Sequence, residues 1–165
     1  MEKYAFDHKT TYELINKKYE VLLLEAQNKI VDSYFQYIEK KREPKDRFYM
    51  PRRKQLIKIG LVDALQGMID DKYDILCVSL VPGAGKSTIE KFFHSAVAGW
   101  FPKDYSLFYS HSGDITRMYY DGVYDIVTND DDYAWHDIFP NLSVTSTNAK
   151  MEQFNIGTVS YTHLR

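Results

Sequence analysis

The sequence predicts an α/β fold in which a parallel β-sheet is flanked by helices and preceded by a helical amino-terminal segment. Three observations support this class. Apolar residues recur every three or four positions in the first part of the chain, the run "YDILCVSL" at 73–80 is apolar and β-favouring, and strand-like and helix-like stretches alternate after it. Because consecutive strands joined by helices lie parallel, the alternation favours a parallel sheet with helical crossovers.

The amino-terminal part is predicted to be helical. From Thr11 to Tyr37 the apolar positions follow the spacing of one helix face, which predicts a long helix with at most one break. This helix is expected to end in the charged segment "EKKREPKDR", where Pro44 disfavours further helix. A second helical pattern follows Pro51 and continues to Met68.

Strand and helix patterns alternate from residue 73 onward. The run at 73–80 stops at Pro82 and predicts a strand that is buried on both faces. An amphipathic helix is expected from Ser87 to Trp100. It is followed by a strand at "SLFYSH", a helix over about 114–127 and a third strand at "LSVTS".

The composition is that of an ordinary globular chain. The length of 165 residues suits one domain, and a net charge of −2 with 27% charged residues is not that of a disordered protein. The single cysteine, Cys77, excludes a disulfide framework and a cysteine-rich zinc site. No apolar stretch approaches the roughly 20 residues that span a bilayer, and the amino terminus is too polar for a signal peptide. We expect an intracellular protein that is not associated with a membrane.

Charge is unevenly distributed along the chain. Residues 40–58 contain nine basic side chains and two acidic ones, whereas residues 118–149 contain six aspartates and no lysine or arginine. The basic segment could attract phosphates or DNA. Two solvated loops would explain the same pattern.

The stretch "SLVPGAGKSTIEKFF" at 79–93 carries the strongest functional motif. Glycines between a strand and a helix let several backbone N–H groups converge at the positive end of the helix, where phosphates bind. Lys86 would contact the β- and γ-phosphates and serve catalysis, and the Ser87 hydroxyl would bind Mg²⁺. Leu80 stands where the full consensus has glycine. The predicted ATP-binding residues are Pro82, Gly83, Ala84, Gly85, Lys86, Ser87 and Thr88. A glycine turn with an ordinary lysine is the structural alternative.

Gln55 is a further candidate for nucleotide binding. It follows a proline and basic residues in "RFYMPRRKQL", thirty positions before Gly85, and a glutamine amide can both donate to and accept from the edge of adenine. The alternative is a helix amino terminus with a solvated basic turn.

Other chemistry-bearing residues give weaker signals. ATP hydrolysis also needs carboxylates that position Mg²⁺ and water, and no apolar strand ending in two acids is found. Asp130–Asp132 are better explained as an acidic loop after a helix, and Glu90 as a solvated helix residue. Arg117 could stabilise charge in a neighbouring subunit but is more typical of a surface salt bridge. His111 and His136 lack metal-ligand spacing.

The combined motifs resemble a family of phage proteins. The segments "RFYMPRRKQLIKIGLVDAL", "ILCVSLVPGAGKSTIEKFFHSAVAGWFP", "SLFYSHSGDITRMYYDGVYDIV", "YAWHDIFPNLSV" and "NAKMEQFNIG" resemble the amino-terminal ATPase region of tailed-phage terminase large subunits over roughly 45–158. Deviant first positions of the phosphate loop occur in that family, which would explain Leu80. The predicted organisation is a helical segment at 1–46, a partial P-loop ATPase domain at 47–158 and a non-native tail at 159–165, because "VSYTHLR" resembles adapter-derived sequence.

The resemblance implies a motor that couples ATP hydrolysis to translocation of double-stranded DNA into the capsid. It implies the cofactors ATP and Mg²⁺, and the portal protein and a small terminase subunit as partners. It further implies a homo-oligomeric ring in the cytoplasm of the infected bacterial host. The second acidic motif and the nuclease of the family would lie beyond residue 158, so this chain is expected to bind ATP and to hydrolyse it poorly. The resemblance therefore also implies an incomplete sheet, which lacks at least one central strand and exposes an apolar edge.

Two alternatives remain open. A small-molecule or nucleoside kinase also uses "PGAGKST", although such kinases usually begin almost at the loop strand, whereas 73 residues precede Asp74 here. The second alternative is a non-hydrolysing nucleotide-binding domain, in which the aromatic-rich helix at 11–40 docks a partner protein.

Overall fold

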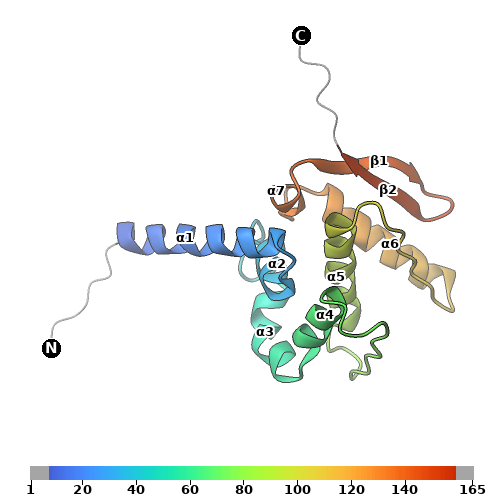
Figure 1. Cartoon of the computed structure of the whole chain (residues 1–165), viewed down its shortest axis with the longest axis horizontal. Helices are drawn as coiled ribbons and strands as arrows, with labels where there is room; N and C mark the ends of the chain where they lie inside the picture. Colours follow the sequence, from blue (N-terminus) through green and yellow to red (C-terminus); the bar gives the residue numbers. More distant parts are fainter. Residues whose placement is uncertain (1–7, 159–165) are drawn as a thin grey trace, which may run out of the picture.

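The computed structural model describes residues 8–158 and shows a mainly helical molecule with one β-hairpin (Figure 1). A central helix, α5, is surrounded by other helices, while α1 projects from the body. In chain order the elements are α1 (His8–Gln27), α2 (Val31–Ile38), α3 (Tyr49–Lys58), α4 (Leu61–Ile69), α5 (Lys86–Trp100), α6 (Gly113–Thr128), α7 (Trp135–Ile138), β1 (Leu142–Asn148) and β2 (Gln153–Thr158).

The predicted α/β class, a P-loop NTPase fold with a parallel sheet, is wrong for the described part of the chain. Residues 8–158 form seven helices and a single two-stranded antiparallel sheet, β1 with β2. The predicted strands at 73–80 and 106–111 have no strand partner. Strand formation requires backbone hydrogen bonds to a second segment, which a local apolar pattern does not guarantee.

The segment at 73–80 is not buried on both faces as predicted. Leu76, Val78 and Leu80 are half-buried against the core, whereas Ile75 and Cys77 on the other face are exposed. This alternation is the one expected of an extended segment with one solvated face.

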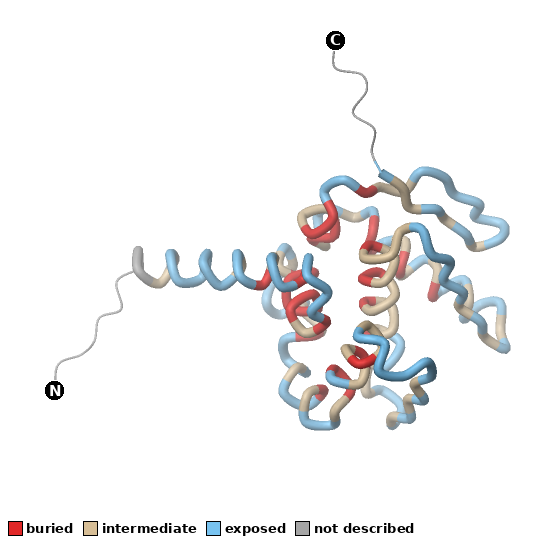
Figure 2. The backbone as a smooth tube through the Cα atoms, in the orientation of Figure 1, coloured by how far each residue is buried: buried red, intermediate tan, exposed pale blue. Residues whose placement is uncertain are grey.

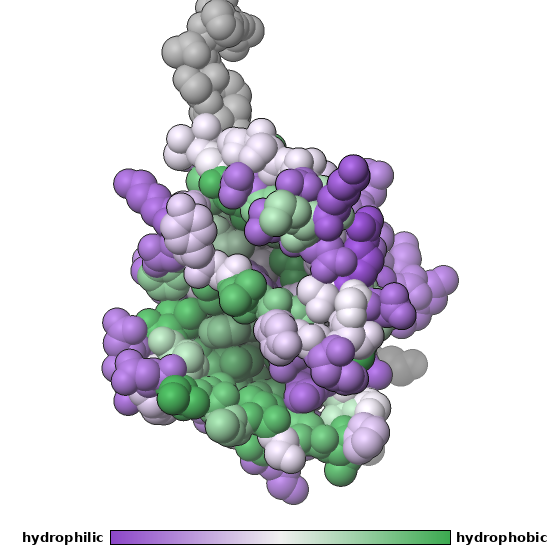
Figure 3. All heavy atoms as spheres, turned by 90° about the vertical axis from the view of Figure 1, so that its right-hand side faces the viewer, coloured by the Kyte–Doolittle hydropathy of each residue, from purple (hydrophilic) through white to green (hydrophobic). Residues whose placement is uncertain are grey.

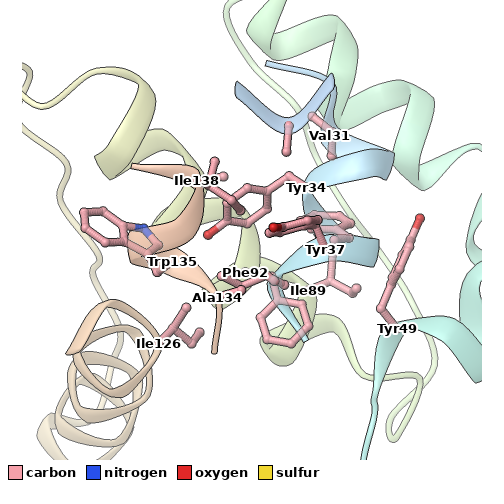
Figure 4. Packing of buried hydrophobic residues seen from close by; sticks show 14 of the residues in the cluster. Val31, Tyr34, Tyr37, Tyr49, Ile89, Phe92, Ile126, Ala134, Trp135 and Ile138 are labelled. Atoms are coloured by element: carbon pink, nitrogen blue, oxygen red, sulfur yellow. The ribbon is translucent and has the colours of Figure 1, made fainter. Parts of the chain in front are cut away.

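The core lies where α2, α5 and α7 meet (Figures 2 and 4). The fully buried side chains include Tyr34, Phe92 and Trp135. Ser95 of α5 connects the three helices, because its hydroxyl lies 2.8 Å from the Tyr34 hydroxyl and its carbonyl accepts a 3.0 Å bond from Trp135 Nε1. The core includes residues on both sides of position 46, the predicted domain boundary, which stays a prediction.

Each of the two predicted helical stretches forms two helices, and the first of them contains the one break that the sequence allowed. Lys29, with φ of 66°, separates α1 from α2, and Gly60, with φ of 74°, separates α3 from α4. A left-handed residue ends the regular helical path and lets the apolar face of the next helix turn toward the core.

The third predicted strand forms, but in an antiparallel hairpin. β1 pairs with β2 from Leu142 opposite Thr158 to Asn148 opposite Gln153, with an irregularity between Val144 and Ser146. The hairpin packs on α6, where the ring of Phe154 contacts those of Tyr120 and Tyr124 at centroid distances of 5.8 and 5.7 Å.

Within residues 8–158, no helix is long and apolar enough to cross a membrane. The predicted non-native tail at 159–165 lies outside the described residues.

Candidate functional site

The candidate site is the turn at residues 81–85 together with the first turn of α5. Gly83 and Gly85 adopt φ values of 80° and 86°, a left-handed conformation that costs other residues energy. The Ala84 N–H donates to the Val81 carbonyl at 3.2 Å and closes the turn. The Gly85 carbonyl then accepts the N–H groups of Thr88 and Ile89, both at 3.1 Å, so that α5 begins immediately after the second glycine.

Several backbone donors at this turn have no acceptor within residues 8–158. They are the N–H groups of Gly83, Gly85, Lys86 and Ser87, and no side chain caps the helix. Unpaired donors at a helix amino terminus, together with the positive end of the helix dipole, favour an anion. The space beside Gly83 is open, since a β-carbon there would meet nothing within 4 Å.

The side chains at the start of α5 are available to a ligand. Lys86 and Ser87 are exposed, and in the described part of the chain neither side chain has a hydrogen-bond or ion-pair partner. Thr88 is half-buried and Pro82 is exposed. These residues fit a phosphate group with an associated Mg²⁺, for which an ammonium group and a hydroxyl are suitable contacts.

Phe48, the residue immediately before α3, contacts the glycine turn. A β-carbon on Gly85 would lie 2.2 Å from the tip of the Phe48 ring, so the two residues approach as closely as a glycine allows. Phe48 is positioned by Glu39, a carboxylate that is only 1% exposed at the end of α2. Its oxygens accept the N–H groups of Phe48 and Tyr49 at 2.8 Å and thereby cap α3.

Gln55 lies on α3 and is exposed. Its side chain makes no hydrogen bond within residues 8–158, and its spacing from Phe48 and Arg52 places the three on one face of the helix. The same helix that contacts the glycine turn through Phe48 therefore carries Gln55 two turns further on. A role of Gln55 in adenine recognition stays a prediction.

An open pocket of about 370 Å³ lies beside the candidate site. Its walls come from α4, α5, α6 and the segments at 73–80 and 106–108. Most of its lining is apolar, including Leu65, Ile89 and Phe93. Lys86 and Glu90 also line it. Figure 3 views this side of the molecule and shows hydrophobic surface around a hollow.

The other candidate residues make surface interactions and do not assemble into a metal or catalytic cluster within residues 8–158. Arg117 forms a surface ion pair with Asp121 at 3.1 Å and donates to the Ala149 carbonyl, as a surface salt bridge would. Asp130–Asp132 follow α6 in a loop, where Asp130 pairs with His136 at 2.7 Å. Among residues 8–158, no group of three or more His, Cys, Asp or Glu side chains could hold a metal ion.

Much of the basic segment at 40–58 is engaged within the protein. Lys40 pairs with Asp137 at 2.7 Å, and Arg53 pairs with Asp32 at 2.6 Å. Arg47 donates to the carbonyls of Lys40 and Arg42. Within the described residues, the side chains of Lys45, Lys54 and Lys58 have no such partner, so the charge open to an outside ligand is smaller than the sequence count.

No family model, curated protein or solved structure matches this chain.

Sequence reasoning did not single out Phe48 or Arg52. Both lie in the motif that drew attention to Gln55, at the i, i+4 and i+7 positions of a helix face. That spacing was the only sequence signal that the two residues share a helix face with Gln55. The contact of Phe48 with Gly85 could not be read from it, because it joins distant parts of the chain.

Proposed function

We propose that residues 82–88 bind the phosphates of ATP together with Mg²⁺. The proposal is carried by four backbone N–H groups at the glycine turn that find no acceptor within residues 8–158. They lie directly beside Lys86, whose side chain has no partner among the same residues. Such donors and an ammonium group together match the charge and geometry of a polyphosphate. The proposal depends on this local geometry and not on a parallel sheet.

Each residue has a distinct role in the proposed complex. The N–H groups from Gly83 to Ser87 would surround one phosphate, and Lys86 would neutralise the next. The Ser87 hydroxyl would be a ligand of Mg²⁺. Mg²⁺ would screen the phosphate charge.

The larger function rests on the family resemblance of the sequence. In this proposal the chain is the ATP-binding part of a phage DNA-packaging motor that moves double-stranded DNA. The portal protein, the small terminase subunit and a ring of identical subunits would belong to the complete machine in the host cytoplasm. The sequence has no apolar strand ending in two acids, so the proposal for this chain is ATP binding rather than turnover.

Substitution of Lys86 tests the proposal. Isothermal titration calorimetry with ATP and Mg²⁺ should show binding that Lys86→Ala weakens at least tenfold. The melting temperature should stay unchanged, because the Lys86 side chain is exposed and has no partner in the described part of the chain. Lys103→Ala removes the same charge beyond the opposite end of α5, roughly 20 Å away, and should bind as the parent does. Equal affinity of the parent and Lys86→Ala would refute the assignment.

A further inference from the structure

Arg52 and Phe48 form a stacked pair next to the glycine turn. The guanidinium carbon of Arg52 lies 4.3 Å from the centre of the Phe48 ring, and Arg52 Nη1 donates to the Phe48 carbonyl at 3.1 Å. The edge of the same ring contacts Gly85. A single aromatic ring therefore separates the Arg52 guanidinium from the turn that we propose binds phosphate.

The neighbouring arginine on α3 shows a different arrangement. Arg53 donates from Nε and Nη2 to both oxygens of Asp32, at 2.6 to 3.2 Å, so its charge is neutralised within the protein. Arg52 is exposed and, among residues 8–158, has no carboxylate partner. Of its five N–H donors, the Phe48 carbonyl occupies one.

Phe48 is fixed by two contacts, and it therefore also fixes the guanidinium of Arg52 that stacks on its ring. Its backbone N–H is bound by the buried Glu39, and its ring meets Phe92 of the core edge-on at a centroid distance of 6.2 Å. Stacking on an aromatic face leaves the N–H edges of a guanidinium free for other hydrogen bonds. The pair thus holds a charged donor group beside the turn and reduces the side-chain entropy lost on binding.

We propose that Arg52 is a second cation of the phosphate site. It contacts the polyphosphate of the bound nucleotide from α3, whereas Lys86 contacts it from α5. The inference rests on the proposed function, since it assigns a residue to the same site. A guanidinium presents two parallel N–H groups to phosphate oxygens, a geometry that a lysine lacks. Phe48 is the positioning residue, because it acts only through Arg52 and Gly85.

The test compares Arg52→Ala with Lys54→Ala. Lys54 is exposed on the same helix and unpaired in the described part of the chain, so the control removes one charge of equal sign. The probes are ATP with Mg²⁺ and inorganic tripolyphosphate, titrated at one fixed salt concentration. Arg52→Ala should weaken both probes about tenfold, the loss of a charge-assisted hydrogen bond, whereas Lys54→Ala should leave both within about twofold.

A third variant separates charge from geometry. Arg52→Lys keeps the charge but not the planar fork, and should recover only part of the affinity for tripolyphosphate. Full recovery would overturn the role of the stacked guanidinium.

The remaining outcomes distinguish this inference from the proposed function. If the parent binds ATP, Lys86→Ala loses it and Arg52→Ala behaves like Lys54→Ala, the assignment of Arg52 is refuted while the phosphate site stands. If Arg52→Ala weakens ATP but not tripolyphosphate, the residue contacts the nucleoside and the phosphate assignment is again refuted. If the parent binds neither probe, the proposed function fails and the inference fails with it.

Discussion

At the scale of single residues, the two glycines before α5 differ in their surroundings although their conformations are alike. Both have φ in the left-handed region, but the space around Gly83 is open whereas Gly85 faces the Phe48 ring. Gly83 therefore tolerates a side chain at the cost of backbone strain alone. A side chain at position 85 would in addition displace the Phe48 ring, which links the turn to α3.

We expect Gly85→Ala to destabilise the protein more than Gly83→Ala. Gly83→Ala should cost about 1–2 kcal/mol of unfolding free energy, the strain of a left-handed alanine. Gly85→Ala adds a collision at 2.2 Å with the Phe48 ring and should cost more. Urea unfolding of both variants measures the difference, and equal losses would show that Phe48 does not restrict Gly85.

Single residues also show how much of the site the sequence reveals. The glycines, Lys86 and Ser87 are contiguous, so the turn and the start of α5 follow from their residue types. Phe48 and Arg52 belong to another helix and join the site only through tertiary packing. Local chemistry could predict the first group, and no local rule could place the second.

At the scale of elements, α2 and α3 are joined by a polar network around Asp32. Its Oδ1 accepts the hydroxyl of Tyr49 at 2.6 Å, and both oxygens accept Arg53. Burial alone would raise the pKa of Asp32, but the hydrogen bonds from Arg53 and Tyr49 and the Arg53 charge together hold it below its ordinary value of 3.8. The ionised carboxylate is therefore more stable in the folded than in the unfolded chain.

The lowered pKa of Asp32 predicts how stability depends on pH. The contribution is present in full above the unfolded value near 3.8 and is lost as the pH falls through the lower folded value. At pH 7, Asp32→Asn should lower the unfolding free energy by about 1–3 kcal/mol, because Tyr49 and Arg53 lose a charged acceptor.

Urea unfolding at pH 7 and pH 3 measures this dependence. The difference between the parent and Asp32→Asn should shrink at pH 3. Asp121→Asn, in a surface pair whose aspartate is 56% exposed, should change stability little at either pH. A difference for Asp32→Asn that is the same at both pH values would contradict the role of the charge.

The elements also differ in how far sequence could predict them. α5 and α6 match the predicted helices closely, because apolar periodicity and glycine or serine boundaries agree there. The breaks at Lys29 and Gly60 were not located, since apolar spacing continues across them. The predicted strand at 142–146 forms within β1, but its partner is the next segment along the chain.

At the scale of the whole molecule, two extended apolar segments lie on the surface. Ile75 is 79% exposed and Leu107 is 91% exposed, and neither segment pairs with a strand within residues 8–158. Unpaired backbone edges with apolar side chains favour association between chains. The predicted sheet failed here because pairing depends on which segments meet, whereas the sequence pattern sets only the extended conformation and its alternation.

We expect the protein to self-associate as its concentration rises, and Ile75→Lys or Leu107→Lys to weaken this association. A lysine on an extended edge opposes pairing by charge and solvation. Sedimentation velocity over a hundredfold concentration range measures the effect. Ile59→Lys, at a half-exposed position after α3, is the control and should associate as the parent does. Unchanged association in the first two variants would exclude these segments as the contact.

The two tryptophans are placed so that their fluorescence reports on one part of the molecule. Trp100 donates from Nε1 to the Ala26 carbonyl at 2.8 Å, and Trp135 is fully buried with its Nε1 on the Ser95 carbonyl. Both indoles thus lie at the junction of α1, α5 and α7, at the end of α5 remote from the glycine turn. Their emission spectrum should shift to longer wavelength when this junction opens and should stay nearly constant when phosphate binds at the other end of the helix.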